Sequence, residues 1–115
     1  MRHHNANRKF GRKKNQRNAL MKSLAVALVS KEKIQTTEPK AKELRPYAER
    51  LVSYAKKGTL AAHRDLVALV GGVQAKKLMT DIGPRYKDRK GGYTRITKLG
   101  IRVKDASPRA QIEFV

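Results

Sequence analysis

The pattern of apolar and polar positions predicts helices and short strands along most of the chain. Four stretches carry apolar residues at helical spacing, over residues 15–30, 38–57, 59–70 and 73–82. Three short runs rich in β-branched or alternating apolar residues predict strands, over residues 33–36, 93–103 and 110–115. The last two runs are expected to form an antiparallel hairpin. We therefore expect an α+β fold, with about four helices packed on a small mixed three-stranded sheet.

Capping and breaking residues give the expected ends of these elements. Asn15 is the expected cap of the first helix, and Thr37 that of the second. Gly58 is a natural end for the second helix, and Gly83-Pro84 for the fourth. Pro46 falls inside the second helix, where a proline removes one hydrogen bond and should bend the axis.

The charge of the chain points to a polyanionic partner. Its 115 residues include 28 Lys and Arg against 9 Asp and Glu, which gives a formal net charge of +19. Such an excess causes self-repulsion in a folded protein unless a partner neutralises it, and it is typical of nucleic-acid binding. The chain has no cysteine, which excludes disulfides and thiol catalysis. Its longest apolar segment, residues 24–29, is too short to span a membrane.

The first 14 residues form a basic arm, and residues 15–115 are expected to form a single domain. No acidic residue occurs among the first 17, and Phe10 is the only large apolar side chain after Met1 and before the first helix. We expect the arm to be disordered in the free protein and to become ordered along a phosphate backbone. The alternative is a solvated tail without a partner. His3 and His4 are adjacent and have no further ligand nearby, so they do not predict a metal site.

A second cationic stretch, residues 83–103, combines cations with tyrosines and glycines. Tyr86 and Tyr93 lie among its Lys and Arg residues, and Gly91-Gly92 permits a tight bend. Aromatic rings between cations can stack on unpaired bases, which favours structured RNA over uniform duplex DNA. The alternative is an ordinary solvated loop before a strand.

No pattern in the sequence indicates catalysis. There is no phosphate-binding glycine loop, no zinc-protease motif and no serine in a nucleophile context. Glu43 and Glu49 lie beside cations of the second helix, where surface ion pairs explain them. We expect neither enzyme activity nor a cofactor. A free-standing DNA-compacting protein explains the charge equally well, and it predicts a dimer with its cations on one face.

Four segments resemble bacterial large-subunit ribosomal protein seventeen, and together they run from one end of the chain to the other. They are Met1-Arg2-His3, the stretch from Ile34 to Leu44 (IQTTEPKAKEL), the stretch from Gly91 to Ile96 (GGYTRI), and Ile112 to Val115 (IEFV). The segment 58–74 is least similar to that family, and no function is transferred to it.

The resemblance implies a non-catalytic protein of the cytoplasmic ribosome. It implies binding to large-subunit (23S-type) rRNA near the peptide exit region, as a monomer among neighbouring large-subunit ribosomal proteins, without a membrane. The residues expected to bind rRNA are Arg2, His3, Arg8, Lys9, Phe10, Arg12, Lys13, Lys14, Arg17, Lys40, Lys42, Arg85, Tyr86, Arg89, Lys90, Gly91, Gly92, Tyr93, Arg95, Lys98 and Arg102.

Overall fold

The first element of the computed structural model, which describes residues 13–115, is helix α1, Lys14–Lys31. The prediction that Asn15 caps this helix is wrong, because Asn15 lies inside the first turn. The cap residue is Lys13, whose backbone N–H donates to the side-chain oxygen of Gln16 at 3.3 Å. In a capping box, the side chain at the third helical position accepts a hydrogen bond from the N–H of the cap residue in this way.

Helix α1 ends in a left-handed residue that turns the chain into the sheet. Glu32 has φ 65°, and its N–H donates to the carbonyl of Leu28. Strand β1, Lys33–Thr37, follows at once. The strand predicted over residues 33–36 is thus confirmed, with one more residue.

Helix α2, Glu38–Lys57, is the longest helix of the described chain. Thr37 precedes it as the cap residue, and Gly58 ends it with φ 66°, as predicted. The helix runs through Pro46, whose ring lies on the exposed side. Its buried residues are those of the predicted stripe, Ala41, Leu44, Ala48, Leu51, Val52 and Ala55.

Helix α3, Leu60–Val70, begins at Thr59, whose hydroxyl oxygen accepts a hydrogen bond from the N–H of Ala62 at 3.1 Å. Gly71 has φ 88° and separates α3 from the next helical segment. Leu66 and Val70 of α3 are buried, as expected for its apolar stripe. Leu60 and Val67, expected on the same stripe, are exposed.

The last helical segment continues beyond the predicted stop. It consists of α4 (Gly72–Lys77), the π-helical turn η1 (Leu78–Ile82) and α5 (Gly83–Arg85), without a break between them. The prediction that Gly83-Pro84 ends the helix is therefore wrong. Pro84 lies directly after the π-helical turn, at the start of α5.

The three strands form an antiparallel sheet with β3 in the middle. Its order is β1-β3-β2, where β2 is Thr94–Ile101 and β3 is Pro108–Phe114. Both pairings are antiparallel, so the expectation of a mixed sheet is wrong. The predicted hairpin of the last two strands is confirmed. Gly100 (φ 95°) lies at a register shift between β2 and β3, where the pairing is irregular.

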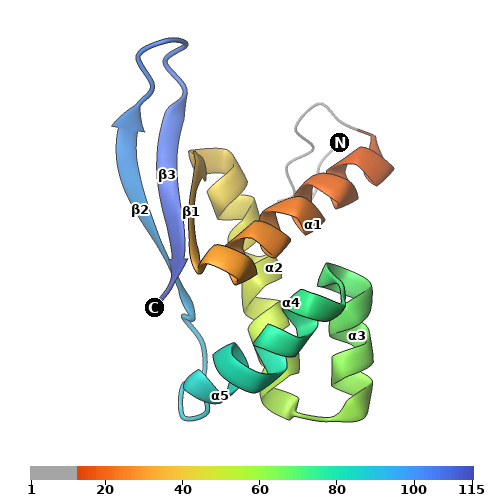
Figure 1. Ribbon diagram of the computed structural model, residues 1–115. Helices are drawn as coiled ribbons and strands as arrows, with labels where there is room; N and C mark the ends of the chain where they lie inside the picture. Colours follow the sequence, from red (N-terminus) through yellow and green to blue (C-terminus); the bar gives the residue numbers. More distant parts are fainter. Residues whose placement is uncertain (1–12) are drawn as a thin grey trace, which may run out of the picture.

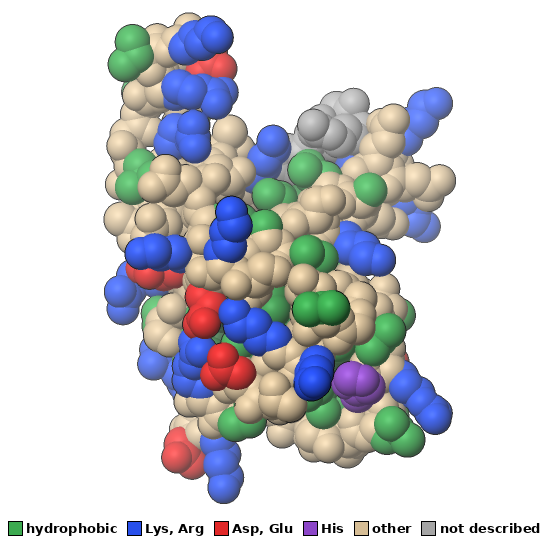
Figure 2. Space-filling view, in the orientation of Figure 1, with side chains coloured by type: hydrophobic (Ala, Val, Ile, Leu, Met, Phe, Trp, Pro, Cys, Tyr) green, Lys and Arg blue, Asp and Glu red, His purple; other side chains and the backbone are tan. Residues whose placement is uncertain are grey.

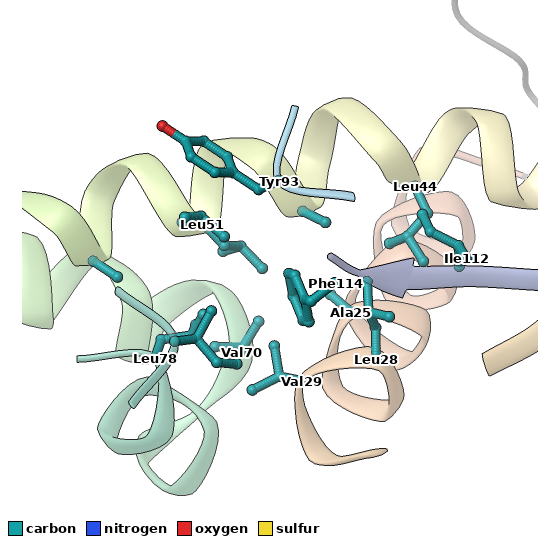
Figure 3. Packing of buried hydrophobic residues seen from close by; sticks show 14 of the residues in the cluster. Ala25, Leu28, Val29, Leu44, Leu51, Val70, Leu78, Tyr93, Ile112 and Phe114 are labelled. Atoms are coloured by element: carbon teal, nitrogen blue, oxygen red, sulfur yellow. The ribbon is translucent and has the colours of Figure 1, made fainter. Parts of the chain in front are cut away.

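The helices cover one face of the sheet, and the β2–β3 hairpin extends beyond them (Figure 1). Strand β3 alternates as predicted, with Ala110, Ile112 and Phe114 buried. These side chains meet Leu28, Leu44 and other buried residues of α1 and α2 in one core (Figure 3). The fold is α+β, as the sequence predicts, and it leaves the other face of the hairpin and its turn to solvent.

Candidate nucleic-acid interface

The basic loop between α5 and β2 is fixed to α2 by two side chains, one in the middle of the helix and one in its last turn. The carboxylate of Glu49 accepts hydrogen bonds from the Gly92 N–H at 3.1 Å and from the Thr94 hydroxyl at 3.2 Å. Lys56 Nζ donates to the Tyr93 hydroxyl at 2.9 Å and also to the carbonyl of Arg89. The backbone of the loop that carries these cations is therefore held in place on α2.

The tyrosines of this loop do not face solvent. Tyr86 and Tyr93 are each only 4% exposed, and their ring centroids lie 5.3 Å apart. The Tyr86 hydroxyl donates to the carbonyl of Val115, and burial raises the pKa of Tyr86. The expectation that these rings stack on unpaired bases is thus wrong for this fold, because either ring would have to leave the core. In Figure 3 the hydroxyl of Tyr93 points away from the other labelled side chains.

Three of the predicted cations, two in the loop and one in early β2, are exposed. Lys90 has no ion pair or hydrogen bond with any residue of the described chain. Arg89 donates from Nε to the carbonyl of Gly91 at 3.2 Å. Arg95 is 64% exposed and lies 3.8 Å from Glu113, at the outer limit of an ion pair. These charges are available to an anionic partner.

Arg85, by contrast, is already paired. It donates to the carboxylates of Glu32 and of Asp81, the latter at 3.2 Å. The hydrogen bond from Arg85 lowers the pKa of Glu32 below its ordinary value of 4.5. Arg85 therefore connects the end of α1 to α5, which is a structural role that the sequence did not reveal.

Two further cations predicted from the sequence also differ in their exposure and in their internal pairing. Lys98 is 74% exposed and lies 3.6 Å from Glu38, which also pairs with Lys42 at 3.0 Å. Arg102 holds the hairpin turn, because its guanidinium donates to Asp105 at 2.8 and 2.6 Å. These hydrogen bonds hold the pKa of Asp105 well below its usual range.

Three more predicted residues begin α1. Lys13 and Lys14 are exposed and Arg17 is half-buried, and the first turn of α1 has no acidic residue. Cations at this end oppose the helix dipole, so a nearby anion would stabilise the turn. The predicted arm residues Arg2, His3, Arg8, Lys9, Phe10 and Arg12 lie outside the described residues.

Two arginines that the sequence did not single out face the same side as Lys90. Arg45 and Arg50 are exposed on α2 and line an open groove with Lys90 and Gly91. In the sequence, Arg45 and Glu49 have the spacing of an ordinary helix ion pair, which hides their position beside the loop. Because Arg45 and Arg50 are far from Lys90 in the sequence, no local sequence pattern indicates that these residues lie together.

Lys and Arg side chains lie over the hairpin, α1 and the helical body on the face shown in Figure 2. They are not confined to one strip, and several acidic side chains lie among them on that face. Within residues 13–115, no group of three or more His, Asp or Glu side chains is placed to hold a metal ion. No helix in this part of the chain is long and apolar enough to cross a membrane.

Known proteins resemble this chain from one end to the other. The family model for ribosomal protein L17 matches residues 20–115. The "large ribosomal subunit protein bL17" of Campylobacter jejuni subsp. jejuni is 53% identical, over 100% of this chain and 99% of that protein. Its counterpart in Campylobacter concisus is 48% identical, over 100% of this chain and 98% of that protein. The counterpart in Campylobacter lari is 51% identical, with 100% and 99% coverage.

Proposed function

The chain belongs to the ribosomal protein L17 family, and from this we propose that it is a structural constituent of the large ribosomal subunit. The observation that carries the proposal is the similarity to large-subunit proteins along the whole chain. As part of the ribosome, the protein acts in the cytoplasm and contributes to translation without catalysing a reaction.

More specifically, we propose that the protein binds and stabilises large-subunit rRNA. Two surfaces supply the cations: the arm with the start of α1, and the loop with early β2. Lys90 and Arg95 are exposed there and lack close ion pairs, so they can neutralise phosphates and release counterions. The protein binds as a monomer, near the peptide exit region, beside other large-subunit proteins.

The distribution of cations also supports ribosomal binding over DNA compaction. Charges on the hairpin, α1 and the helical body suit a protein that RNA surrounds from several sides (Figure 2). A free-standing DNA-compacting protein would instead gather its cations on one face that matches a duplex.

Sedimentation of a cell lysate that contains the tagged protein tests the proposal. We expect the protein to travel with the large subunit and to stay there through a high-salt wash, because salt screens contacts enclosed within a subunit much less than exposed ones. Release into the soluble fraction, or recovery with the nucleoid, would contradict the ribosomal assignment.

A further inference from the structure

We propose that the groove between α2 and the loop 90–93 binds one nucleotide of a non-helical rRNA segment through its phosphate. The inference rests on the proposed function and names one place where RNA would enter. The groove is open to solvent and has a volume of about 470 Å³. This size lies in the range of small-ligand sites, so it admits a single nucleotide but not a duplex.

The charges of the groove favour an anion. Three cations line it, Arg45 and Arg50 from α2 and Lys90 from the loop. The one carboxylate among its lining residues, that of Glu49, already accepts hydrogen bonds from Arg45, Gly92 and Thr94. The acid is therefore occupied in holding the loop, and the groove keeps an excess of positive charge.

Much of the donor capacity of these cations is unused. Arg45 donates to Glu49 through Nε alone, at 3.4 Å, which leaves its terminal nitrogens without a partner in the described chain. Arg50 only lies over the ring of Tyr47, 5.7 Å from its centroid. A phosphate accepts paired N–H groups of a guanidinium in a planar arrangement, which strengthens and orients the contact.

The remaining surface of the groove suits the sugar and base of the same nucleotide. Pro46 presents an exposed ring on α2, and Gly91 on the opposite side has no side chain that would block the approach. A nucleotide within a duplex is stacked and paired, so only an unpaired segment can place its phosphate and base here together. A single acidic side chain of a protein partner would leave most of these donors unused.

A single cysteine at Ser53 can report whether RNA fills the groove. Ser53 is an exposed lining residue, and the chain has no cysteine of its own. The matched control is Ala68→Cys, at an exposed position of α3 that does not line the groove. The rate of alkylation by N-ethylmaleimide is measured for the free protein, for its complex with deproteinised large-subunit rRNA, and for whole large subunits.

We expect rRNA to slow the alkylation of Ser53→Cys at least tenfold and to leave Ala68→Cys nearly unchanged. Equal reactivity of Ser53→Cys in the free protein and in the rRNA complex would overturn the inference while the proposed function stands. Protection in whole subunits but not in the rRNA complex would also overturn it, since a protein would then cover the groove. If the protein does not bind rRNA at all, both the inference and the proposed function fail.

A charge variant supplies an independent measurement. Arg50→Gln should weaken binding to rRNA roughly tenfold, because one charge-assisted contact is lost, and should reduce the salt slope by about one. Arg64→Gln removes the same charge from an exposed position of α3, and we expect a change of less than about twofold. Equal effects of the two variants would mean that the groove contributes only general charge.

Discussion

Gly83 lies where the helical segment 72–85 packs against α2, and a larger residue does not fit there. A Cβ atom at this position would be 2.9 Å from the carbonyl oxygen of Leu78 and 3.0 Å from the Cβ of Ala55. Both values are below ordinary contact distances, and one of the neighbours is backbone. The π-helical turn η1 ends at Ile82, directly before this residue, so the close approach and the irregular turn occur together.

We therefore predict that Gly83→Ala destabilises the protein by roughly 1–3 kcal/mol, the usual cost of overpacking a core. The free energy of unfolding is measured by urea denaturation followed by circular dichroism. Gly72→Ala is the matched control, because Gly72 begins α4 without a positive φ, and no atom lies within 4 Å of the place where an added methyl group would sit. It should be neutral or stabilise by up to about 1 kcal/mol. Equal effects at the two sites would show that the packing at Gly83 can relax.

The two tyrosines show the limit of sequence reasoning at single residues. Their neighbours in sequence are cations and glycines, which suggested an exposed loop. Their burial depends on partners far away in the chain, such as the carbonyl of Val115 for Tyr86 and the Lys56 ammonium for Tyr93. No local pattern contains these contacts, so the sequence located the loop but not the direction of its rings.

At the scale of elements, Glu32 connects the end of α1 to the last helical segment. Its carboxylate pairs with Arg85 and, at 3.5 Å, with Lys77. The hydrogen bond from Arg85 lowers the pKa of Glu32 in the folded protein, while burial opposes the shift. Because the pKa is lowered, the ion pairs stabilise the fold at pH values above the ordinary pKa of 4.5. This contribution is lost as the pH falls through the folded pKa.

We predict that Glu32→Gln lowers the free energy of unfolding at pH 7 by at most about 1 kcal/mol, because the side chain is 37% exposed and water screens the pairs. The difference from the unaltered protein should shrink below pH 4.5, where the carboxyl group becomes protonated. Urea denaturation at a series of pH values measures it. Asp65→Asn removes an acid without an ion pair in the described chain, and so corrects for the change in net charge. If Glu32→Gln lowers the free energy of unfolding as much at pH 3 as at pH 7, the role assigned to the ion pairs of Glu32 is contradicted.

Element boundaries followed from the sequence wherever a local interaction determines them. Thr59 and Gly58 set their helix ends through a side-chain hydrogen bond and a left-handed backbone, and both act over a few residues. The alternation along residues 110–115 likewise gave the buried face of β3. The stop at Gly83-Pro84 failed because the helix is held there by packing on α2, which a local pattern does not contain.

At the scale of the whole molecule, the candidate interface depends on chain segments that meet only in the fold. Glu49 and Gly92 are 43 residues apart in sequence, and their hydrogen bond holds the loop on α2. The groove with Arg45 and Arg50 lies where the loop meets α2 beside this contact. Composition predicted a polyanionic partner, but the choice of which cations remain available required the structure, since Arg85 and Arg102 are engaged in internal pairs.

The exposed cations of the loop and of early β2 should determine much of the salt dependence of rRNA binding. Each cation that neutralises a phosphate adds about 0.7–0.9 to the slope of log affinity against log salt concentration. We predict that changing Arg89, Lys90 and Arg95 together to Ala reduces the slope by about 2–3 and leaves the fold intact, because all three side chains are exposed. Filter binding to large-subunit rRNA at several salt concentrations measures the slope, and circular dichroism checks the fold.

The control for this prediction removes the same charge elsewhere. Lys22, Arg64 and Lys76 are exposed on α1, α3 and α4, and none of them has an ion pair within the described residues. Because net charge changes equally in both triple variants, a difference between their slopes isolates contacts with phosphate at the loop. If the loop variant keeps the slope of the unaltered protein, its cations do not meet phosphate. The phosphate contacts would then lie at other cations, such as those of the arm, the start of α1 and α2.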